Sequence, residues 1–279
     1  MGTLAENSRR DEGWQAGLRL GFRAGPRRTV LAERQRHGPL AVQRPFYPEG
    51  EVCHVYLLHP PGGVVGGDSL SIDVQIGPDA KTLVTTPGAT KFYRSAGPLA
   101  RQTQLITVQG GARLEWLPQE NIFFPGAEVE LATRVELQGD ACLALWEIQC
   151  LGRPVIGEGF DSGHIDSRLS VSRDGEPLLM ERLRVDPDNR SRLSLMAGLS
   201  VGGTLLISHA GEPEVAACRD LLFAGGPDYA GATLIEDILV VRYLGDSTER
   251  ARRLFTDIWQ KLRATTLGYP PGVPRIWAT

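Results

Sequence analysis

The sequence predicts a mainly β protein with two α-helices near its C-terminal end. Its 279 residues include 33 glycines and 19 prolines, which interrupt helices and suit short strands joined by turns. Many short segments alternate apolar and polar residues and are bounded by Gly, Pro or Asp turn signals. The last third of the chain instead adds the three-to-four-residue apolar period of helices.

Alternating segments follow one another from Trp14 onward. Over residues 16–23, the side chains of Leu18, Leu20 and Phe22 fall on one face, as in a half-buried strand. The same pattern predicts further strands over residues 52–58, 70–76, 82–86, 102–108, 113–117 and 128–137. No motif repeats at a fixed period, so the pattern leaves a sandwich, a barrel and a solenoid of stacked strands open.

The last third begins with strands and one short helix. Residues 204–208 and 232–243 are expected to be strands. Between them, Pro213 is expected to open a short helix that ends at Gly225 and Gly226. Proline suits the first turn of a helix, and glycine suits the position just beyond its last turn.

A second helix is predicted after Asp246. Asp246 would be its N-cap, Glu249 would complete a capping box, and Gly268 would end it. The spacing of its apolar residues predicts one buried face. That face consists of Ala251, Leu254, Phe255, Ile258, Trp259 and Leu262.

The domain organisation is expected to be simple. Residues 1–13 are polar and charged without an apolar period, which predicts a flexible N-terminal tail. No Ser- or Pro-rich linker divides residues 14–279, so we expect them to fold as a single domain.

Charge and composition exclude several classes of protein. The 30 basic and 33 acidic residues leave a net charge of −3, without the basic excess typical of nucleic-acid binding. No apolar run is long enough to span a membrane, and the N-terminus lacks the apolar stretch of a secretory signal. Four scattered cysteines predict free thiols rather than a disulfide framework. We therefore expect a cytoplasmic protein that binds neither membranes nor nucleic acids.

Sequence signatures of catalysis are missing. The five histidines form no H-E-x-x-H pattern, the cysteines form no C-x-x-C pair, and no G-x-S-x-G is present. Paired carboxylates could still make a carbohydrate-active enzyme on a β-solenoid, which remains the alternative. The acids available for such a pair include Asp68, Glu115, Glu120, Glu147 and Glu181.

Residues 60–68 form the most informative segment. They contain four glycines, Gly62, Gly63, Gly66 and Gly67, directly before Asp68. The glycine spacing resembles that of a phosphate-binding loop, but Asp68 stands where that loop has its lysine, and a carboxylate repels phosphate. The segment is therefore interpreted either as a folded turn or as a glycine-lined passage that presents the Asp68 carboxylate.

Two further segments combine turn signals with functional groups. Residues 85–94 surround a Pro-Gly turn with three threonines and end in basic residues that could face a carboxylate or a partner. Residues 115–127 gather large aromatics beside acids and an asparagine. Such aromatics either fill a core or anchor an interface.

In this order, the three segments resemble the urease accessory protein D family, also called H. The stretches that carry the resemblance are residues 60–68, 85–94, 115–120 and 124–127, supported by 152–153, Glu158 and 274–277. Their order and spacing extend the resemblance over nearly the whole chain from about Trp14.

The resemblance implies a non-catalytic factor for urease maturation with an elongated, β-helix-like body of stacked strands. It implies binding to urease apoprotein on one side and to accessory protein F on the other, with F recruiting the GTPase, accessory protein G. It implies no tightly bound cofactor, and Ni²⁺ in transit through an internal, water-filled passage. The motif residues expected to shape the fold or contact partners are Gly62, Gly63, Gly66, Gly67, Lys91, Tyr93, Arg94, Trp116 and Glu120.

A passage for Ni²⁺ needs ligands that release the ion. Imidazole and thiolate groups hold Ni²⁺ tightly, whereas several weak oxygen sites let an ion move on. Clustered Cys and His ligands are missing from this sequence, and an acid lies beside a glycine-rich turn. We therefore expect Asp68 to line the passage and contact Ni²⁺ transiently. Its expected companions are Thr85, Thr86, Glu147 and Glu181.

Overall fold

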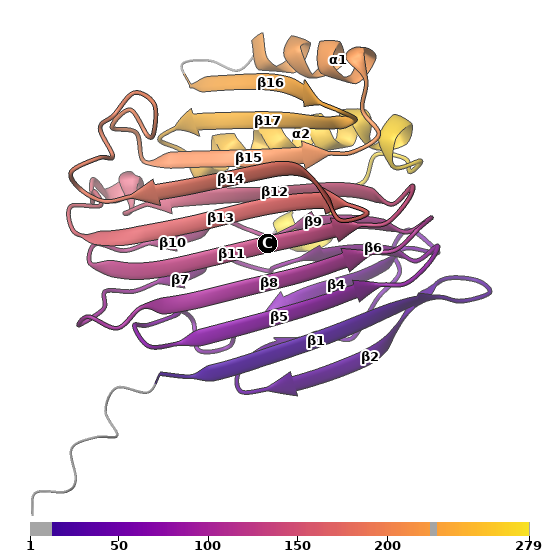
Figure 1. Cartoon of the computed structure of the whole chain (residues 1–279), viewed down its shortest axis with the longest axis horizontal. Helices are drawn as coiled ribbons and strands as arrows, with labels where there is room; N and C mark the ends of the chain where they lie inside the picture. Colours follow the sequence, from indigo (N-terminus) through magenta and orange to yellow (C-terminus); the bar gives the residue numbers. More distant parts are fainter. Residues whose placement is uncertain (1–12, 224–227, 279) are drawn as a thin grey trace, which may run out of the picture.

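The computed structural model describes residues 13–223 and 228–278, and its chain winds between two stacked sheets (Figure 1). The seven-stranded sheet has the order β14-β13-β11-β8-β5-β1-β2. Its strands are β1 (Gln15–Ala24), β2 (Thr29–His37), β5 (Ser69–Ile76), β8 (Ala100–Val108), β11 (Ala127–Leu137), β13 (Gly163–Arg173) and β14 (Glu176–Val185).

The ten-stranded sheet lies behind it in Figure 1 and has the main order β16-β17-β15-β12-β9-β6-β4-β3. These strands are β3 (Ala41–Val42), β4 (Cys53–Leu58), β6 (Lys81–Thr85), β9 (Arg113–Leu117), β12 (Cys142–Leu151), β15 (Val201–Ile207), β16 (Tyr229–Ile235) and β17 (Ile238–Gly245). The short strands β7 (Thr90–Phe92) and β10 (Asn121–Phe123) pair with each other and with the end of β12.

The central strands identify the fold as a β-solenoid. From β4 to β13 the chain alternates between the two sheets, and within each sheet successive strands pair in parallel. Because each return to a sheet adds one parallel strand, the chain coils into stacked turns. The β7–β10 ladder forms a short third wall, where the rings of Phe92 and Phe123 stack with centroids 5.2 Å apart. Of the three architectures that the pattern left open, the structure has the stacked one.

Most predicted strands are confirmed, but one prediction combined two strands, and strands β2, β3, β7, β10, β12, β13 and β14 were not predicted. The segment 232–243 is not one strand but most of the hairpin β16–β17, which turns near Glu236 at a positive φ of 52°. Strand β12 was not predicted because nearly all its side chains are buried, on both faces, so no alternation is visible.

Strand β12 separates two cores. Leu143 and Leu145 point into the solenoid, whereas Ala144 and Trp146 point to its outer side. There the helix α2 (Thr248–Thr266) packs on β12, β15 and β17, and its Phe255 and Trp259 rings lie near Trp146. The predicted buried face of this helix is confirmed, with Leu254 partly buried.

The start of α2 differs from the prediction. Its N-cap is Ser247, whose hydroxyl accepts a hydrogen bond from Arg250 N at 3.2 Å. The Asp246 carboxylate instead accepts one from Ser200 N at 2.9 Å, so a tertiary contact occupies the predicted cap. Gly268 follows the helix with a φ of 73°, as expected for a helix end.

The remaining helical elements lie in the same part of the chain. Helix α1 (Glu212–Phe223) has Pro213 in its first turn, as predicted, and contacts α2 and β16. The glycines predicted to end it, and the predicted tail apart from Gly13, lie outside the described residues. Two short 3-10 helices are η1 (Pro154–Ile156) and η2 (Arg275–Ala278).

Arg263 joins α2 to the sheet through a buried ionic cluster. Its side chain is fully buried and donates hydrogen bonds to both oxygens of Glu115 on β9, at 2.7 and 2.8 Å. It also donates to both oxygens of Glu49, at 2.7 and 2.6 Å. Burial raises the pKa of Glu49, but hydrogen bonds from Arg263 and His54 outweigh it and lower the pKa to about 2.

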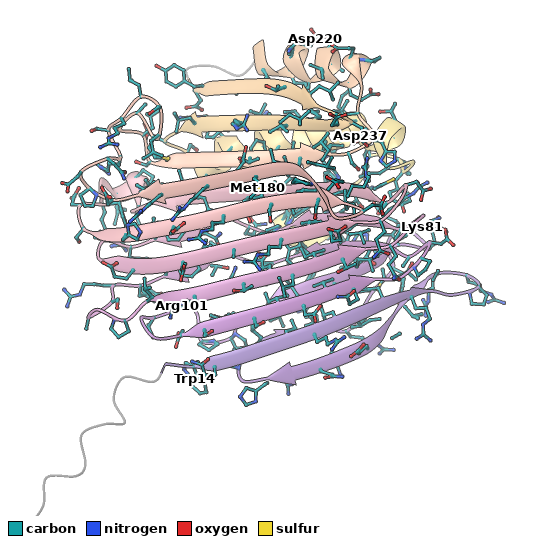
Figure 2. The ribbon with its side chains drawn as sticks, in the orientation of Figure 1. Trp14, Lys81, Arg101, Met180, Asp220 and Asp237 are labelled. Atoms are coloured by element: carbon teal, nitrogen blue, oxygen red, sulfur yellow. The ribbon has the colours of Figure 1, made fainter. Side chains whose placement is uncertain are left out.

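The outer face of the seven-stranded sheet carries polar and charged side chains. Arg101 and Met180 project from it in Figure 2, and Arg101 pairs with Glu130 at 3.1 Å. Trp14 marks the start of β1 in the same view. This face of the seven-stranded sheet encloses no core. Polar groups that could form an interior site therefore lie on the other face of the same sheet, which points into the solenoid.

Candidate functional site

The motif segments come together along one edge of the solenoid. Strands of the ten-stranded sheet end at this edge and strands of the seven-stranded sheet begin there, so the loops 59–68, 86–99, 118–126 and 152–162 stack side by side. Backbone hydrogen bonds join neighbouring loops, as from Val64 N to Lys91 O at 2.7 Å and from Ser95 N to Gly126 O at 2.9 Å. We call these four loops the motif edge.

Close packing explains the glycines of the motif edge. A Cβ on Gly63 would lie 2.1 Å from Cε2 of Tyr93, and one on Gly66 would lie 2.1 Å from Oγ of Ser95. Gly62 and Gly67 adopt positive φ angles of 81° and 91°. The glycines therefore shape the loop, which is one of the two roles expected for them.

Aromatic and basic side chains lie on the outside of the motif edge. The rings of Tyr93 and Phe124 are 4.8 Å apart, and the Arg153 guanidinium lies over Phe124 at 4.9 Å. Lys91 and Arg94 are exposed, so both are accessible to a partner. A partner-binding role for these residues stays a prediction.

Asp68 holds the motif edge to the start of β1. Its side chain is 2% exposed, and its two oxygens accept hydrogen bonds from Trp14 N at 2.7 Å and from Val65 N at 2.9 Å. It lines a surface recess together with His37 and Arg94. The structure does not bring Asp68 together with Glu147 or Glu181.

A band of polar side chains crosses the interior of the solenoid. Glu147, Thr204 and Arg242 are direct neighbours on β12, β15 and β17 of the ten-stranded sheet. From the seven-stranded sheet, Thr133 donates a hydrogen bond to Glu147 Oε1 at 2.5 Å, and Glu181 Oε2 accepts one from Thr204 at 3.1 Å. The other Glu181 oxygen pairs with the Arg242 guanidinium. We call these side chains, with Gln104 beside Thr133, the polar band.

Two cavities meet at Glu147. The outer cavity, of about 520 Å³, lies between β14 and the strands β15 to β17 and is lined by Glu181 and Arg242. The inner cavity, of about 310 Å³, runs from the polar band to the motif edge. Its lining includes His59, Gly62, Gly63, Thr86, Lys91, Gln104, Trp116 and Asn121. Because Glu147 lines both cavities, it separates a space at the end of the sheet stack from a space behind the motif edge.

Burial determines the protonation of Glu147. Desolvation and the nearby Glu181 carboxylate raise the pKa of Glu147, hydrogen bonds from Thr133 and Gln149 act against the rise, and the net pKa is about 7. The carboxyl group can therefore take up or release a proton near neutral pH. Such a group can balance the charge of a cation beside it by losing its proton.

The inner cavity is polar in places. Nε1 of Trp116 and Oε1 of Gln104 are buried, and neither has a hydrogen-bond partner within the described residues. Buried polar atoms of this kind are normally satisfied by water or a ligand. The cavity is large enough for several water molecules at about 30 Å³ each.

Tight metal-binding groups are missing from the described part of the chain. No cluster of three or more His, Cys, Asp or Glu side chains there could hold a metal ion. All four cysteines are free and buried, and burial raises the pKa of Cys150 to about 12 and that of Cys218 to about 11. The thiols are therefore protonated near neutral pH, so the potential ligands of the inner cavity are oxygen atoms and the single imidazole of His59.

Thr85 and Thr86 of the second motif face opposite sides of the ten-stranded sheet. Thr86 lines the inner cavity, and its hydroxyl accepts a hydrogen bond from Gln119 N at 2.8 Å. Thr85 points to the α2 side, where it donates to Leu117 O at 2.5 Å and accepts from Trp277 Nε1 at 3.0 Å. Of the predicted passage residues, Thr86, Glu147 and Glu181 line the two cavities that share Glu147, whereas Thr85 and Asp68 line neither of them.

The sequence reasoning missed four members of the polar band: Gln104, Thr133, Thr204 and Arg242. A signal for one of them was present, because Thr133 falls in the inward register of β11 between Leu131 and Val135. A polar side chain in an otherwise apolar register is a buried polar group that needs a partner. The position of Arg242 could not be found this way, since it depends on the hairpin that was predicted as one strand.

Comparison with known proteins identifies the family. The sequence model of the UreD urease accessory protein family matches residues 15–278. The chain belongs to this family. UreD proteins act in urease maturation and are not enzymes, so the carbohydrate-active alternative is wrong.

Individual UreD proteins are similar over their full length. The urease accessory protein UreD of Alcanivorax borkumensis is 49% identical over 276 residues, which cover 97% of this chain and 94% of the relative. That of Klebsiella aerogenes is 49% identical over 268 residues, covering 96% and 98%. That of Pseudomonas putida is 47% identical over 274 residues, covering 98% of each. As for membranes, none of the helices in the described UreD chain has the length and apolar character needed to cross a bilayer.

Proposed function

We propose that this chain passes Ni²⁺ through its interior to urease apoprotein while it holds the maturation complex together. The observation that carries the proposal is the position of Glu147, which lines both the outer and the inner cavity. An ion entering the outer cavity would meet Glu181 and then Glu147, and it would continue past Thr86 toward the motif edge. Nickel is cargo in this proposal and not a resident cofactor.

The ligand chemistry supports transit rather than storage. The route offers two carboxylates, hydroxyls, amide oxygens and one imidazole, that of His59. Oxygen ligands and a lone imidazole hold Ni²⁺ less firmly than clustered thiolate or imidazole groups. Ionisation of Glu147 near neutral pH would compensate the charge of an arriving cation. The inner cavity leaves room for water, so the ion would keep part of its hydration shell between ligands.

Two cavities that lie on either side of Glu147 fit a protein that works between two partners. We propose that urease apoprotein and accessory protein F dock at opposite sides, and that the GTPase, accessory protein G, joins through F. One cavity would then receive the ion and the other would deliver it. In this proposal Asp68 keeps the motif edge in shape, because backbone N–H groups already occupy both its oxygens.

The test is urease activation under limiting nickel with Glu147→Gln and Glu181→Gln chains. Both variants should still co-purify with urease apoprotein and accessory protein F, but the urease should contain less nickel and recover less activity. Glu130→Gln, on the outer face of the seven-stranded sheet, is the matched control. Nickel loading at the full rate by both interior variants would overturn the proposal.

A further inference from the structure

We infer that Arg242 is the resident counter-cation of the passage: its guanidinium neutralises Glu181 until an arriving divalent cation displaces it. The inference rests on the proposed function and adds what keeps nickel from being retained. Arg242 would lower the affinity of the two carboxylates for the ion, so that the ion binds briefly and moves on.

The position of Arg242 is the first support. Its guanidinium joins Glu181 of β14 to β17, and therefore connects the last strand of the seven-stranded sheet to the ten-stranded sheet across the outer cavity. Thr204, whose hydroxyl binds the other Glu181 oxygen, lies between Arg242 and Glu147 in the sheet. A cation held by Glu181 would thus have to share the carboxylate with Arg242 or replace it.

The exposure of the Arg242 side chain allows a cation to replace it at Glu181. The Arg242 side chain is 52% exposed, whereas Glu181 is only 22% exposed. A half-exposed ion pair contributes little net stability, since water can solvate the released guanidinium. Gly231, the cross-strand neighbour of Arg242, has no atom within 4 Å of where a Cβ would stand, which leaves space for the displaced side chain.

The charges around the outer cavity define the role of Arg242. The charged residues lining the outer cavity are Glu147, Glu181, Arg182 and Arg242. Arg182 is already engaged, because its guanidinium donates to both Asp166 oxygens on the outer face of the sheet. Among the described residues that line the outer cavity, Arg242 is therefore the cation that faces the two carboxylates. Without it, ionised Glu147 and Glu181 would present two unopposed negative charges to a divalent ion.

Buried polar atoms beyond Glu147 point independently to a ligand in the passage. Trp116 lines the inner cavity and is 1% exposed, and its Nε1 has no hydrogen-bond partner in the described residues. Gln104, beside Thr133 of the polar band, lines the same cavity and has a buried Oε1 without a partner in the described residues. An unpartnered N–H donor and an unpartnered carbonyl acceptor on residues that line one space suit a hydrated ion that moves with its water molecules.

The test compares Ni²⁺ binding by the full chain in its accessory complex, using the metal alone and a competing chelator. Arg242→Gln should raise the Ni²⁺ affinity about tenfold, the effect of one uncompensated charge near the ion. It should also slow Ni²⁺ release and lower urease activation under limiting nickel. Arg242→Lys should restore most of the wild-type release rate, because lysine keeps the charge.

Arg168→Gln is the matched control. Arg168 is 50% exposed and pairs with Asp166 on the outer face, so this variant loses the same charge at similar exposure without touching the cavities. Unchanged affinity and release in Arg242→Gln would overturn the inference, even if Glu147→Gln lowers nickel loading as the proposed function requires. A gain in affinity that persists in the double variant Glu181→Gln, Arg242→Gln would also overturn it, since the gain must come from the freed Glu181 carboxylate.

Discussion

Thr133 and Glu147 connect the two sheets of the solenoid through a hydrogen bond of 2.5 Å across the interior. Thr133 belongs to β11 and Glu147 to β12, so the bond joins consecutive strands of the coil that lie in opposite sheets. A carboxyl group buried in this way needs donors that replace the water it has lost, and Thr133 is the closer of the two, since Gln149 Nε2 lies 3.5 Å from the other oxygen. The bond therefore supports both the fold and the position of Glu147 between the cavities.

Replacing Thr133 by valine should destabilise the chain although the two side chains have nearly the same shape. The change leaves Glu147 without its closest hydrogen-bond donor, which should cost about 1–2 kcal/mol in free energy of unfolding. Urea denaturation measures this loss in the free energy of unfolding. Thr103→Val, at a position of β8 that faces outward, should change the same free energy by less than about 0.5 kcal/mol. Equal effects of the two substitutions would show that the interior bond contributes nothing.

Arg263→Ala should be the most destabilising single change considered for α2. It leaves Glu115, which is 1% exposed, without its charge partner, and breaking a buried pair costs about 3–5 kcal/mol. Arg253→Ala in the same helix removes an exposed arginine and serves as the control. Thermal denaturation of both variants should separate them clearly. A melting temperature of Arg263→Ala close to that of the control would contradict the role given to this cluster.

The Glu49 carboxyl should make the stability depend on pH in the acid range. Its pKa is about 2 in the folded chain and about 4.5 in the unfolded chain, so the ionised group stabilises the fold above pH 4.5. This contribution, up to about 3 kcal/mol, is lost as the pH falls toward 2. Glu49→Gln should therefore destabilise the chain at pH 7 and have little effect near pH 2.5. Denaturation curves of both chains between pH 2.5 and pH 7 measure the difference in free energy of unfolding. A difference that stays constant over this range would refute the low pKa given to Glu49.

The motif edge should tolerate a methyl group at one glycine and not at another. Gly63→Ala places its Cβ against the Tyr93 ring, and overpacking of this kind costs about 1–3 kcal/mol. Gly88→Ala lies on the same edge with nothing within 4 Å of the new atom. Thermal denaturation and co-purification with urease apoprotein should both be impaired for Gly63→Ala and unchanged for Gly88→Ala. Wild-type behaviour of Gly63→Ala would mean that the loop has another way to pack.

Local patterns were sufficient where one face of an element meets water. The alternation in β1 and β11 and the apolar face of α2 were readable because burial changes with every residue or every turn. The motif segments were also readable, since glycines and turn residues act on their own stretch of backbone. The same reasoning failed for β12, which is buried on both faces, and for the N-cap of α2, where Ser200 takes the carboxylate of Asp246.

The sequence by itself determined the β character, the C-terminal helix and the family of this protein, because each depends on residues close together in the chain or on their order. Only the tertiary structure decided which side chains face the interior. Adjacent residues of a strand point to opposite sides, so Thr86 reaches the inner cavity while Thr85 binds Trp277 on the other side. Glu147, Glu181 and Arg242 meet only because the stacking of the strands aligns them, and that register is a property of the whole coil.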